Sequence, residues 1–208
     1  MNAVSRPRPQ EYVRGVVAIV RLERIDEPEA MVEALAAGGI RYVEFTLGSG
    51  GAIDAIQRSV QHAVPDVVIG AGTVLEPTDV ADVAAAGAAF CVSPHTDTDV
   101  IRACLDRGLV PVPGAFTSTE IVQALRAGAR SVKLFPAGVV GPSLIRALRG
   151  PFPDVDLIPT GAIRLSEAGD YRRAGAAGVG IGSDLVGDGR GSEELTAAAR
   201  RATDAWRT

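Results

Sequence analysis

A recurring glycine signal limits the folds that this chain can adopt. Five segments rich in Ala, Leu or Arg each end at a glycine, and a short apolar run follows it. The turns are Ala37-Gly38-Gly39-Ile40, Ala86-Gly87-Ala88, Arg107-Gly108-Leu109, Ala127-Gly128-Ala129 and Ala174-Gly175-Ala176. This pattern is typical of a helix that ends in glycine and leads into a strand. From Gly87 to Gly108 to Gly128 the steps are 21 and 20 residues, the length of one strand–loop–helix unit. Alternating units of this kind predict a parallel sheet covered by helices.

Eight short apolar segments are the expected strands. They span residues 16–21, 42–47, 67–74, 89–94, 110–115, 131–136, 156–161 and 178–185. Helices are expected to begin near Glu29, Gly51, Thr78, Asp97, Ser118, Pro142, Ser166 and Ser192. Eight such units predict an α/β fold, a closed (β/α)8 TIM barrel. An open doubly wound sheet would favour a Gly-x-Gly-x-x-Gly turn after the first strand, and the chain has Arg21-Leu22-Glu23-Arg24 there.

Length and charge narrow the function classes. The 208 residues suit a single barrel domain over 1–208, with a short N-terminal extension of about 1–15. A net charge of −4 without a long basic run argues against nucleic acid as a partner. We expect Cys91 and Cys104 to be reduced and buried. Neither a signal core nor a membrane-spanning apolar run is present in the sequence, so we expect no membrane partner and a cytoplasmic location.

Lys133 is the only lysine of the chain, and it lies in the expected strand 131–136. Arginine cannot lose its proton at ordinary pH, whereas a buried lysine can. A neutral amine attacks a carbonyl and forms a Schiff base. Alternatively, an arginine-biased composition left one lysine by chance, but such a survivor belongs on an exposed helix face rather than in a buried strand.

Side-chain alternation places a carboxylate beside this amine. In residues 42–47 the apolar Val43, Phe45 and Leu47 should face the helices, which leaves Glu44 and Thr46 pointing inward. The same alternation points Lys133 and Phe135 inward. Burial raises the pKa of a carboxyl and lowers that of an amine, and both shifts favour Schiff-base chemistry. The alternative is a buried salt bridge with a purely structural role.

Small residues end the last two strands. Thr160-Gly161-Ala162 and Gly182-Ser183 offer backbone N–H groups at the place where this fold often binds phosphate, although glycines also occur at tight corners. Of the two histidines, His62 is expected on a helix surface and His95 at the barrel mouth. The sequence has no His/Asp/Glu cluster with metal-ligand spacing, so we expect no metal, and it has no Gly-x-Ser-x-Gly elbow.

The chain resembles a known family through several segments. They are Val43-Glu44-Phe45-Thr46-Leu47, Gly70-Ala71-Gly72-Thr73-Val74-Leu75, Val92-Ser93-Pro94, Pro113-Gly114 and Val132-Lys133-Leu134-Phe135-Pro136-Ala137. They are similar to the class I 2-dehydro-3-deoxy-phosphogluconate (KDPG) and 4-hydroxy-2-oxoglutarate (KHG) aldolases and their galactonate-derived (KDPGal) relatives. The resemblance implies a (β/α)8 barrel, commonly a homotrimer, without a metal.

The resemblance also implies roles for individual residues. Lys133 matches the Schiff-base lysine and Glu44 the general acid/base. Thr73, Pro94 and Phe135 match pocket-lining positions, and Thr160, Gly161 and Ser183 match the phosphate end. Ala162 and Gly182, beside them, are also expected to contact the substrate.

Three positions depart from the family pattern: Gly48 replaces an arginine that holds the pyruvyl carboxylate, Ala162 a glycine, and His95 another glycine. Arg21 ends the first expected strand, and we expect it to hold the carboxylate from there. The alternative is that Arg21 points only to solvent at the rim.

The implied reaction is cleavage of 2-dehydro-3-deoxy-6-phosphogluconate, or a close 2-oxo-3-deoxy sugar acid, to pyruvate and an aldehyde such as glyceraldehyde 3-phosphate. The resemblance implies no external cofactor. The alternatives are an aldolase for unphosphorylated 4-hydroxy-2-oxoglutarate, an aldolase for the galactonate-derived isomer, and a catalytically silent barrel that binds a sugar phosphate. The sequence leaves the substrate's phosphorylation and its C4 stereochemistry open.

Overall fold

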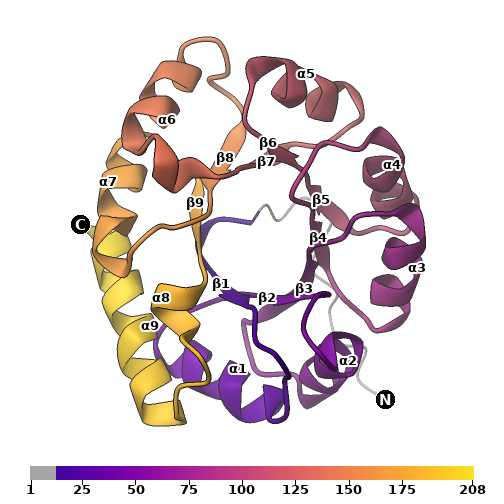
Figure 1. Cartoon of the computed structure of the whole chain (residues 1–208), viewed down its shortest axis with the longest axis vertical. Helices are drawn as coiled ribbons and strands as arrows, with labels where there is room; N and C mark the ends of the chain where they lie inside the picture. Colours follow the sequence, from indigo (N-terminus) through magenta and orange to yellow (C-terminus); the bar gives the residue numbers. More distant parts are fainter. Residues whose placement is uncertain (1–12) are drawn as a thin grey trace.

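The computed structural model describes residues 13–208, so most of the expected N-terminal extension lies outside the described residues. The strands are β1 (Gly15–Val20), β2 (Tyr42–Thr46), β3 (Val68–Gly72), β4 (Phe90–Val92), β5 (Val110–Val112), β6 (Gly114–Ala115), β7 (Ser131–Leu134), β8 (Asp156–Pro159) and β9 (Gly178–Ile181). They form a six-stranded sheet in the order β5-β4-β3-β2-β1-β9 and a three-stranded sheet in the order β6-β7-β8. The pairing is parallel throughout, and the strands curve round a central axis with the helices outside (Figure 1).

The expected strand 110–115 is divided into β5 and β6 at Pro113. Proline has no N–H to give to a ladder. The Pro113 carbonyl still accepts a hydrogen bond of 2.9 Å from the N–H of Lys133. The chain therefore leaves the larger sheet after pairing with β4 and joins the smaller one beside β7.

The helices are α1 (Pro28–Ala37), α2 (Ala52–His62), α3 (Pro77–Ala85), α4 (Thr98–Asp106), α5 (Ser118–Arg126), α6 (Pro142–Arg149), α7 (Ala168–Arg173), α8 (Ser183–Val186) and α9 (Ser192–Arg207). The start expected near Ser166 falls on a 3₁₀ turn, Leu165–Glu167, that leads into α7. The expectation of a strand over 178–185 is wrong at its end. At Gly182 the backbone leaves the extended region, with φ −102° and ψ −103°, and α8 begins at the next residue.

Glycines end the helices as the sequence pattern predicts. Gly39, Gly87, Gly108, Gly128 and Gly175 have φ between 70° and 106°, a left-handed conformation that glycine adopts without a steric penalty. The chain can therefore turn from each helix into the next strand.

The interior has two apolar layers. One packs the outer faces of the strands against the helices and includes Val43 and Phe45. The other fills the space inside the strands with a smaller cluster: Val13, Val17, Tyr42, Phe90, Val92, Val112 and Ile158. This inner cluster forms the floor on which the polar residues described below lie.

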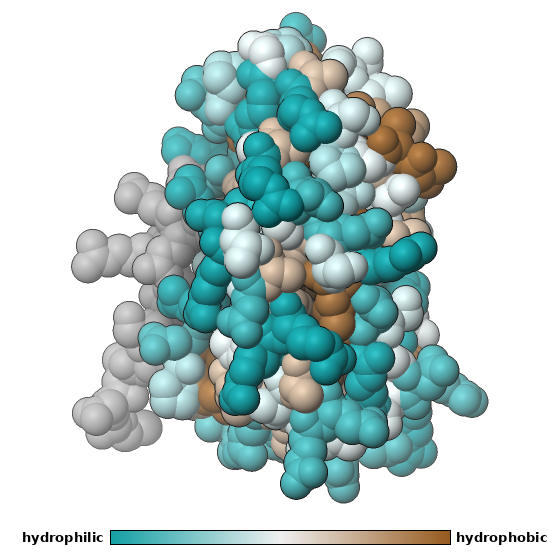
Figure 2. Space-filling view, turned by 90° about the vertical axis from the view of Figure 1, so that its left-hand side faces the viewer, coloured by the Kyte–Doolittle hydropathy of each residue, from teal (hydrophilic) through white to brown (hydrophobic). Residues whose placement is uncertain are grey.

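Other sequence expectations can be compared with the structure. Cys91 and Cys104 are both free and buried, as predicted. The face in Figure 2 carries mostly hydrophilic side chains with separate small apolar patches. Among residues 13–208, the helices are all too short or too polar to span a membrane.

The start of α5 supplies a test of stability. The carboxylate of Glu120 accepts hydrogen bonds from the Thr117 hydroxyl and from the N–H groups of Phe116 and Thr117, at 2.7, 2.9 and 2.8 Å. The Thr117 hydroxyl contributes most, and together these bonds lower the pKa of Glu120 below its ordinary value of 4.5. A carboxyl group whose pKa is lower in the folded than in the unfolded protein stabilises the fold at pH values above its pKa in the unfolded chain. This stabilisation is lost as the pH falls through the pKa of the group in the folded protein.

We therefore expect Glu120→Gln to lower the free energy of unfolding by about 1 kcal/mol at pH 7, as other helix-capping changes do. The deficit should shrink as the pH drops below 4.5. Urea unfolding of both proteins at about pH 7 and about pH 3.5 measures this, with exposed Glu23→Gln as the control. An equal deficit at both values would contradict the capping role.

Candidate active site

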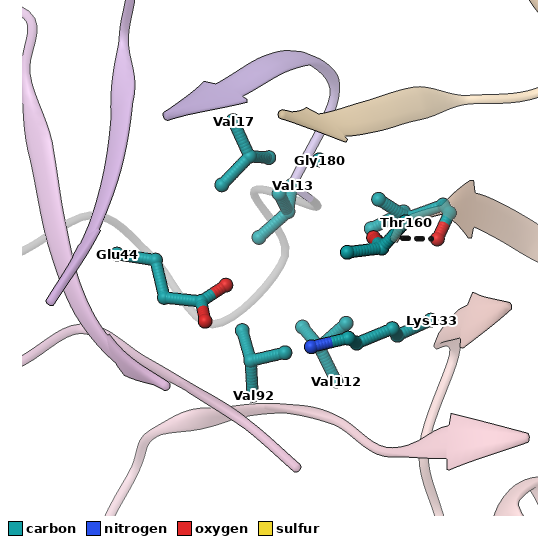
Figure 3. A pocket seen from close by; sticks show the side chains of 9 residues that line it. Val13, Val17, Glu44, Val92, Val112, Lys133, Thr160 and Gly180 are labelled. Carbon is teal, nitrogen blue, oxygen red and sulfur yellow. Dashed lines mark hydrogen bonds between the residues drawn. The ribbon is translucent and has the colours of Figure 1, made fainter. Parts of the chain in front are cut away.

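The polar residues singled out from the sequence meet at the carboxyl ends of the strands. Glu44 lies on β2 and Lys133 on β7, and their side chains are only 2% and 6% exposed. Both line one small cavity of about 10 Å³, enough for about one water molecule. The rest of its lining is apolar or small, apart from the Thr160 hydroxyl, and consists of Val13, Val17, Val92, Val112, Ile158, Thr160 and Gly180 (Figure 3).

Glu44 and Lys133 point toward one another from opposite sides of this cavity (Figure 3). In the described part of the chain, the two side chains form no hydrogen bond or ion pair with each other, and Glu44 Oε1 has no partner. Burial raises the pKa of Glu44 above its ordinary value of 4.5, although the positive charges of Lys133 and Arg21 oppose the shift. A direct salt bridge, the structural alternative to a catalytic pair, is therefore not formed.

Glycine creates the space for the carboxylate. A Cβ atom at Gly72, on the adjacent strand β3, would lie 1.8 Å from Glu44 Oε1. Gly180 on β9 likewise makes room for Thr160, whose Oγ1 would lie 2.6 Å from an added Cβ. The Thr160 hydroxyl donates to the carbonyl of Ile158 at 3.2 Å. Two glycines thus allow polar side chains to occupy an otherwise apolar interior.

An aromatic ring lies beside the amine. Lys133 Nζ is 5.2 Å from the centroid of the Phe135 ring, within the range of a cation–π contact. Phe135 follows β7 and is 38% exposed, so it lies at the rim rather than inside the cavity. Pro94 is half-buried, and His95 is exposed beside it. The Pro94 loop packs against β6 at Gly114. A Cβ atom at Gly114 would lie 2.3 Å from the Pro94 carbonyl carbon, so only glycine allows this approach.

Arg21 reaches across the mouth. Its Nη2 donates to Thr73 Oγ1 at 3.0 Å, so the guanidinium extends past β2 to the residue after β3. Its charge also acts on Glu44. Thr73 has φ +59°, an unusual conformation for a β-branched residue that is frequent at functional sites. The alternative orientation, with Arg21 directed only to solvent, is not observed.

The residues of the expected phosphate end lie on two adjoining loops. Gly161 and Ala162, with φ +96° and +53°, follow β8, and Gly182 and Ser183 follow β9. Ser183 is the first residue of α8, and the N–H of Leu165 donates to Asp184 Oδ2 of this helix at 2.7 Å, which joins the segment after β8 to α8. A Cβ at Gly161 would lie 2.9 Å from the Phe135 ring, so this loop also borders the rim near Lys133.

Two residues of the site, Gly72 and Ser49, could not be recognised from the sequence. Gly72 gave no sign of its contact with Glu44, because the two are distant in sequence and meet only through strand pairing. Ser49 lies in a Gly-Ser-Gly-Gly run that looks like a flexible loop, yet it is 4% exposed and hydrogen-bonded. His62, expected on a helix surface, ends α2 and contacts Glu33 at 2.6 Å. Within residues 13–208, His, Cys, Asp and Glu form no group suited to hold a metal ion.

Known proteins are similar to this chain in sequence and in fold. A family model described as KDPG and KHG aldolase matches residues 12–198. The 2-dehydro-3-deoxy-phosphogluconate aldolase of Pseudomonas aeruginosa is 39% identical over 157 residues, which are 75% of this chain and 71% of that one. A solved structure described as native KDPGal has a TM-score of 0.87 at 34% identity, covering 92% of this chain and 94% of its own.

A further solved structure shows a bound reactant. It is the KDPG aldolase of Legionella pneumophila with pyruvate captured at low pH as a covalent carbinolamine, with a TM-score of 0.77 and 31% identity over 89% of this chain and 93% of its own. The family match spans most of the chain and includes the strands that carry Glu44 and Lys133. The chain therefore belongs to the KDPG and KHG aldolase family, whose members are carbon–carbon lyases.

Proposed function

We propose that this protein is a class I aldolase in which Lys133 forms a Schiff base with a 2-oxo-3-deoxy sugar acid and Glu44 transfers protons. One observation carries the proposal. Among residues 13–208, a buried carboxylate whose Oε1 has no hydrogen-bond partner and a buried amine face each other across an apolar cavity without pairing. Uncompensated burial of this kind is expensive in a purely structural site and is typical of catalytic pairs.

The reaction begins at the carbonyl of the substrate. The neutral amine of Lys133 attacks C2 to give a carbinolamine, which loses water and becomes a protonated imine. Glu44, directly or through water, takes the proton of the C4 hydroxyl. The C3–C4 bond then breaks, its electron pair moves into the enamine, and an aldehyde leaves. Protonation of the enamine at C3 and hydrolysis of the imine release pyruvate. The carbinolamine trapped in the Legionella relative supports the first step.

We propose 2-dehydro-3-deoxy-6-phosphogluconate as the substrate and glyceraldehyde 3-phosphate as the aldehyde. The similarity to the Pseudomonas enzyme supports this substrate, and the two joined loops with Gly161, Ala162, Gly182 and Ser183 suit a phosphate group. The likeness to the KDPGal structure supports the galactonate-derived isomer as the second candidate. Pyruvate release from a panel of 2-oxo-3-deoxy sugar acids, with and without 6-phosphate, and from 4-hydroxy-2-oxoglutarate separates these substrates, and a silent binding barrel would release none.

We also propose that the two sheets close into one eight-unit barrel that forms a single domain. The bridge between Thr160 and Gly180 and the 3.0 Å hydrogen bond from Ala177 N to Leu157 O support closure on one side. On the other side, closure is supported by the chain itself, which runs from β5 of the larger sheet through Pro113 into β6 of the smaller one. The family resemblance favours a cytoplasmic homotrimer.

Borohydride in the presence of pyruvate should inactivate the protein and label Lys133, because reduction makes the imine permanent. Peptide mass spectrometry identifies the labelled amine. Since Lys133 is the only lysine, the N-terminal amine is the only competitor and serves as the internal control. Label confined to the terminus, or full activity in Lys133→Arg, would refute the Schiff base.

Glu44→Gln should retain the fold and imine formation but lose about 10²- to 10⁴-fold in turnover, the usual contribution of a general acid or base. Because burial raises the pKa of Glu44, the acid limb of the wild-type rate profile should lie above pH 4.5, where the carboxylate forms, and it should be absent in the variant. Steady-state rates between about pH 4 and 8 measure both effects. A loss below about threefold would leave Glu44 with only an electrostatic role.

A matched pair of glycine variants serves as the control for this assignment. Gly72→Ala should reproduce much of the loss, because the new Cβ displaces the Glu44 carboxylate. Gly48→Ala should not, since nothing lies within 4 Å of a Cβ there. Equal activity of the two variants would contradict the requirement for a fixed carboxylate.

Arg21→Ala should weaken pyruvate imine formation about tenfold or more, because a charge-assisted hydrogen bond contributes roughly 1.5–3 kcal/mol. Arg21→Lys should recover only part of this, since lysine lacks the bidentate fork. The pyruvate concentration that gives half-maximal borohydride inactivation measures the effect. Gly48→Arg, which has open space, is the rescue variant in the Arg21→Ala background. An unchanged pyruvate affinity in Arg21→Ala would exclude Arg21 as the carboxylate anchor.

A further inference from the structure

Two buried hydroxyls at the end of β2 hold the backbone on both sides of Arg21. Thr46 is fully buried and Ser49 is 4% exposed. Thr46 Oγ1 donates to the carbonyl of Val20 at 3.2 Å, and the N–H of Leu22 donates to Ser49 Oγ at 3.1 Å. Val20 and Leu22 are the residues immediately before and after Arg21.

The directions of these bonds follow from the number of protons. The two hydroxyl oxygens are 3.1 Å apart, and each hydroxyl has one proton to donate. Thr46 uses its proton on Val20, so Ser49 must donate to Thr46. The result is one chain of hydrogen bonds from Leu22 N–H through Ser49 and Thr46 to the Val20 carbonyl. Such chains are expected to strengthen cooperatively and to fix a single geometry.

Other contacts of this loop lie farther along the chain. Gly50 N donates to Glu23 O at 2.9 Å, and Ile25 N donates to Gly50 O at 3.0 Å. These bonds fix residues 23–25, whereas the hydroxyl pair acts on the two residues that flank Arg21. At its far end the Arg21 guanidinium is held by Thr73.

We propose that Thr46 and Ser49 are positioning residues that aim Arg21 at the carboxylate of the 2-oxoacid substrate. This inference rests on the proposed function and assigns residues that do not touch the substrate. A long arginine side chain anchored on one strand can approach the mouth at many angles. Fixing both neighbouring peptide groups limits those angles and lowers the conformational entropy lost when the carboxylate binds.

Removal of either hydroxyl tests the assignment. Ser49→Ala and Thr46→Val should raise KM for the 2-oxoacid substrate about three- to tenfold, the effect of one neutral hydrogen bond, and change kcat less than about twofold. Thr46→Ser, which keeps the hydroxyl, should stay near wild type. The matched control is Ser59→Ala, because Ser59 is also buried but its hydroxyl has no partner among the described residues. Circular dichroism verifies the fold, and if Ser49→Ala does not fold, the Thr46 pair gives the same comparison.

A double-variant cycle separates positioning from a merely structural role. If the hydroxyls act through Arg21, adding Ser49→Ala to Arg21→Ala should raise KM less than about twofold further. The inference would be overturned if Ser49→Ala raised KM equally in the wild type and in Arg21→Ala. It would also be overturned if the KM values of Ser49→Ala and Thr46→Val matched that of Ser59→Ala. Failure of the proposed function has a different signature, namely a wild-type protein that neither releases pyruvate nor is trapped on Lys133 by borohydride.

Discussion

Desolvation of two opposite charges inside an apolar ring of strands is the constraint on which the rest of the site depends. Moving an ion out of water has an effective cost of several kcal/mol, and a close ion pair would offset part of it. Glu44 and Lys133 do not form that pair, and no residue of the described part of the chain is a partner of Glu44 Oε1. The larger folded framework must therefore stabilise a costly arrangement, as active sites commonly require. A raised pKa of the Glu44 carboxyl is the direct consequence, and it suits the proton-transfer role proposed for this group.

Glycines on neighbouring strands make room for the buried polar side chains, because the backbone can approach them closely where there is no Cβ atom. Gly72 leaves the volume that the Glu44 carboxylate occupies, and Gly180 does the same for Thr160. Val17, Val92 and Ile158 belong to the inner apolar cluster and line the same small cavity as Glu44 and Lys133, which has room for about one water molecule. The polar atoms are thus confined to the carboxyl ends of the strands, where the loops supply the remaining contacts.

At the mouth of the site, we propose that Arg21 takes the role of the arginine that the family resemblance implies at position 48. At Gly48, where the family resemblance implies an arginine, there is open space. Arg21 directly follows β1, and its guanidinium is hydrogen-bonded to Thr73 after β3. Its neighbours are fixed by hydroxyls from the end of β2, so three adjacent strands contribute to the direction of one guanidinium. A change of anchor between neighbouring strands needs only that the strand ends lie side by side, which parallel pairing guarantees.

The sequence by itself determined the repeating strand–helix order, the inward positions of Glu44 and Lys133 and the presence of a single lysine in a strand. These features depend on local turns, on alternation along a strand and on composition, which act over a few residues. The prediction that the last strand extends to residue 185 was wrong, because the chain turns at Gly182 into α8. The division of the strand 110–115 at Pro113 was not predicted. Only the tertiary structure decided that Glu44 and Lys133 stay unpaired, that Gly72 lies against the carboxylate, and that Ser49 and Thr46 bracket Arg21. These facts depend on strand register and on the three-dimensional distance between residues remote in sequence, which no local pattern specifies.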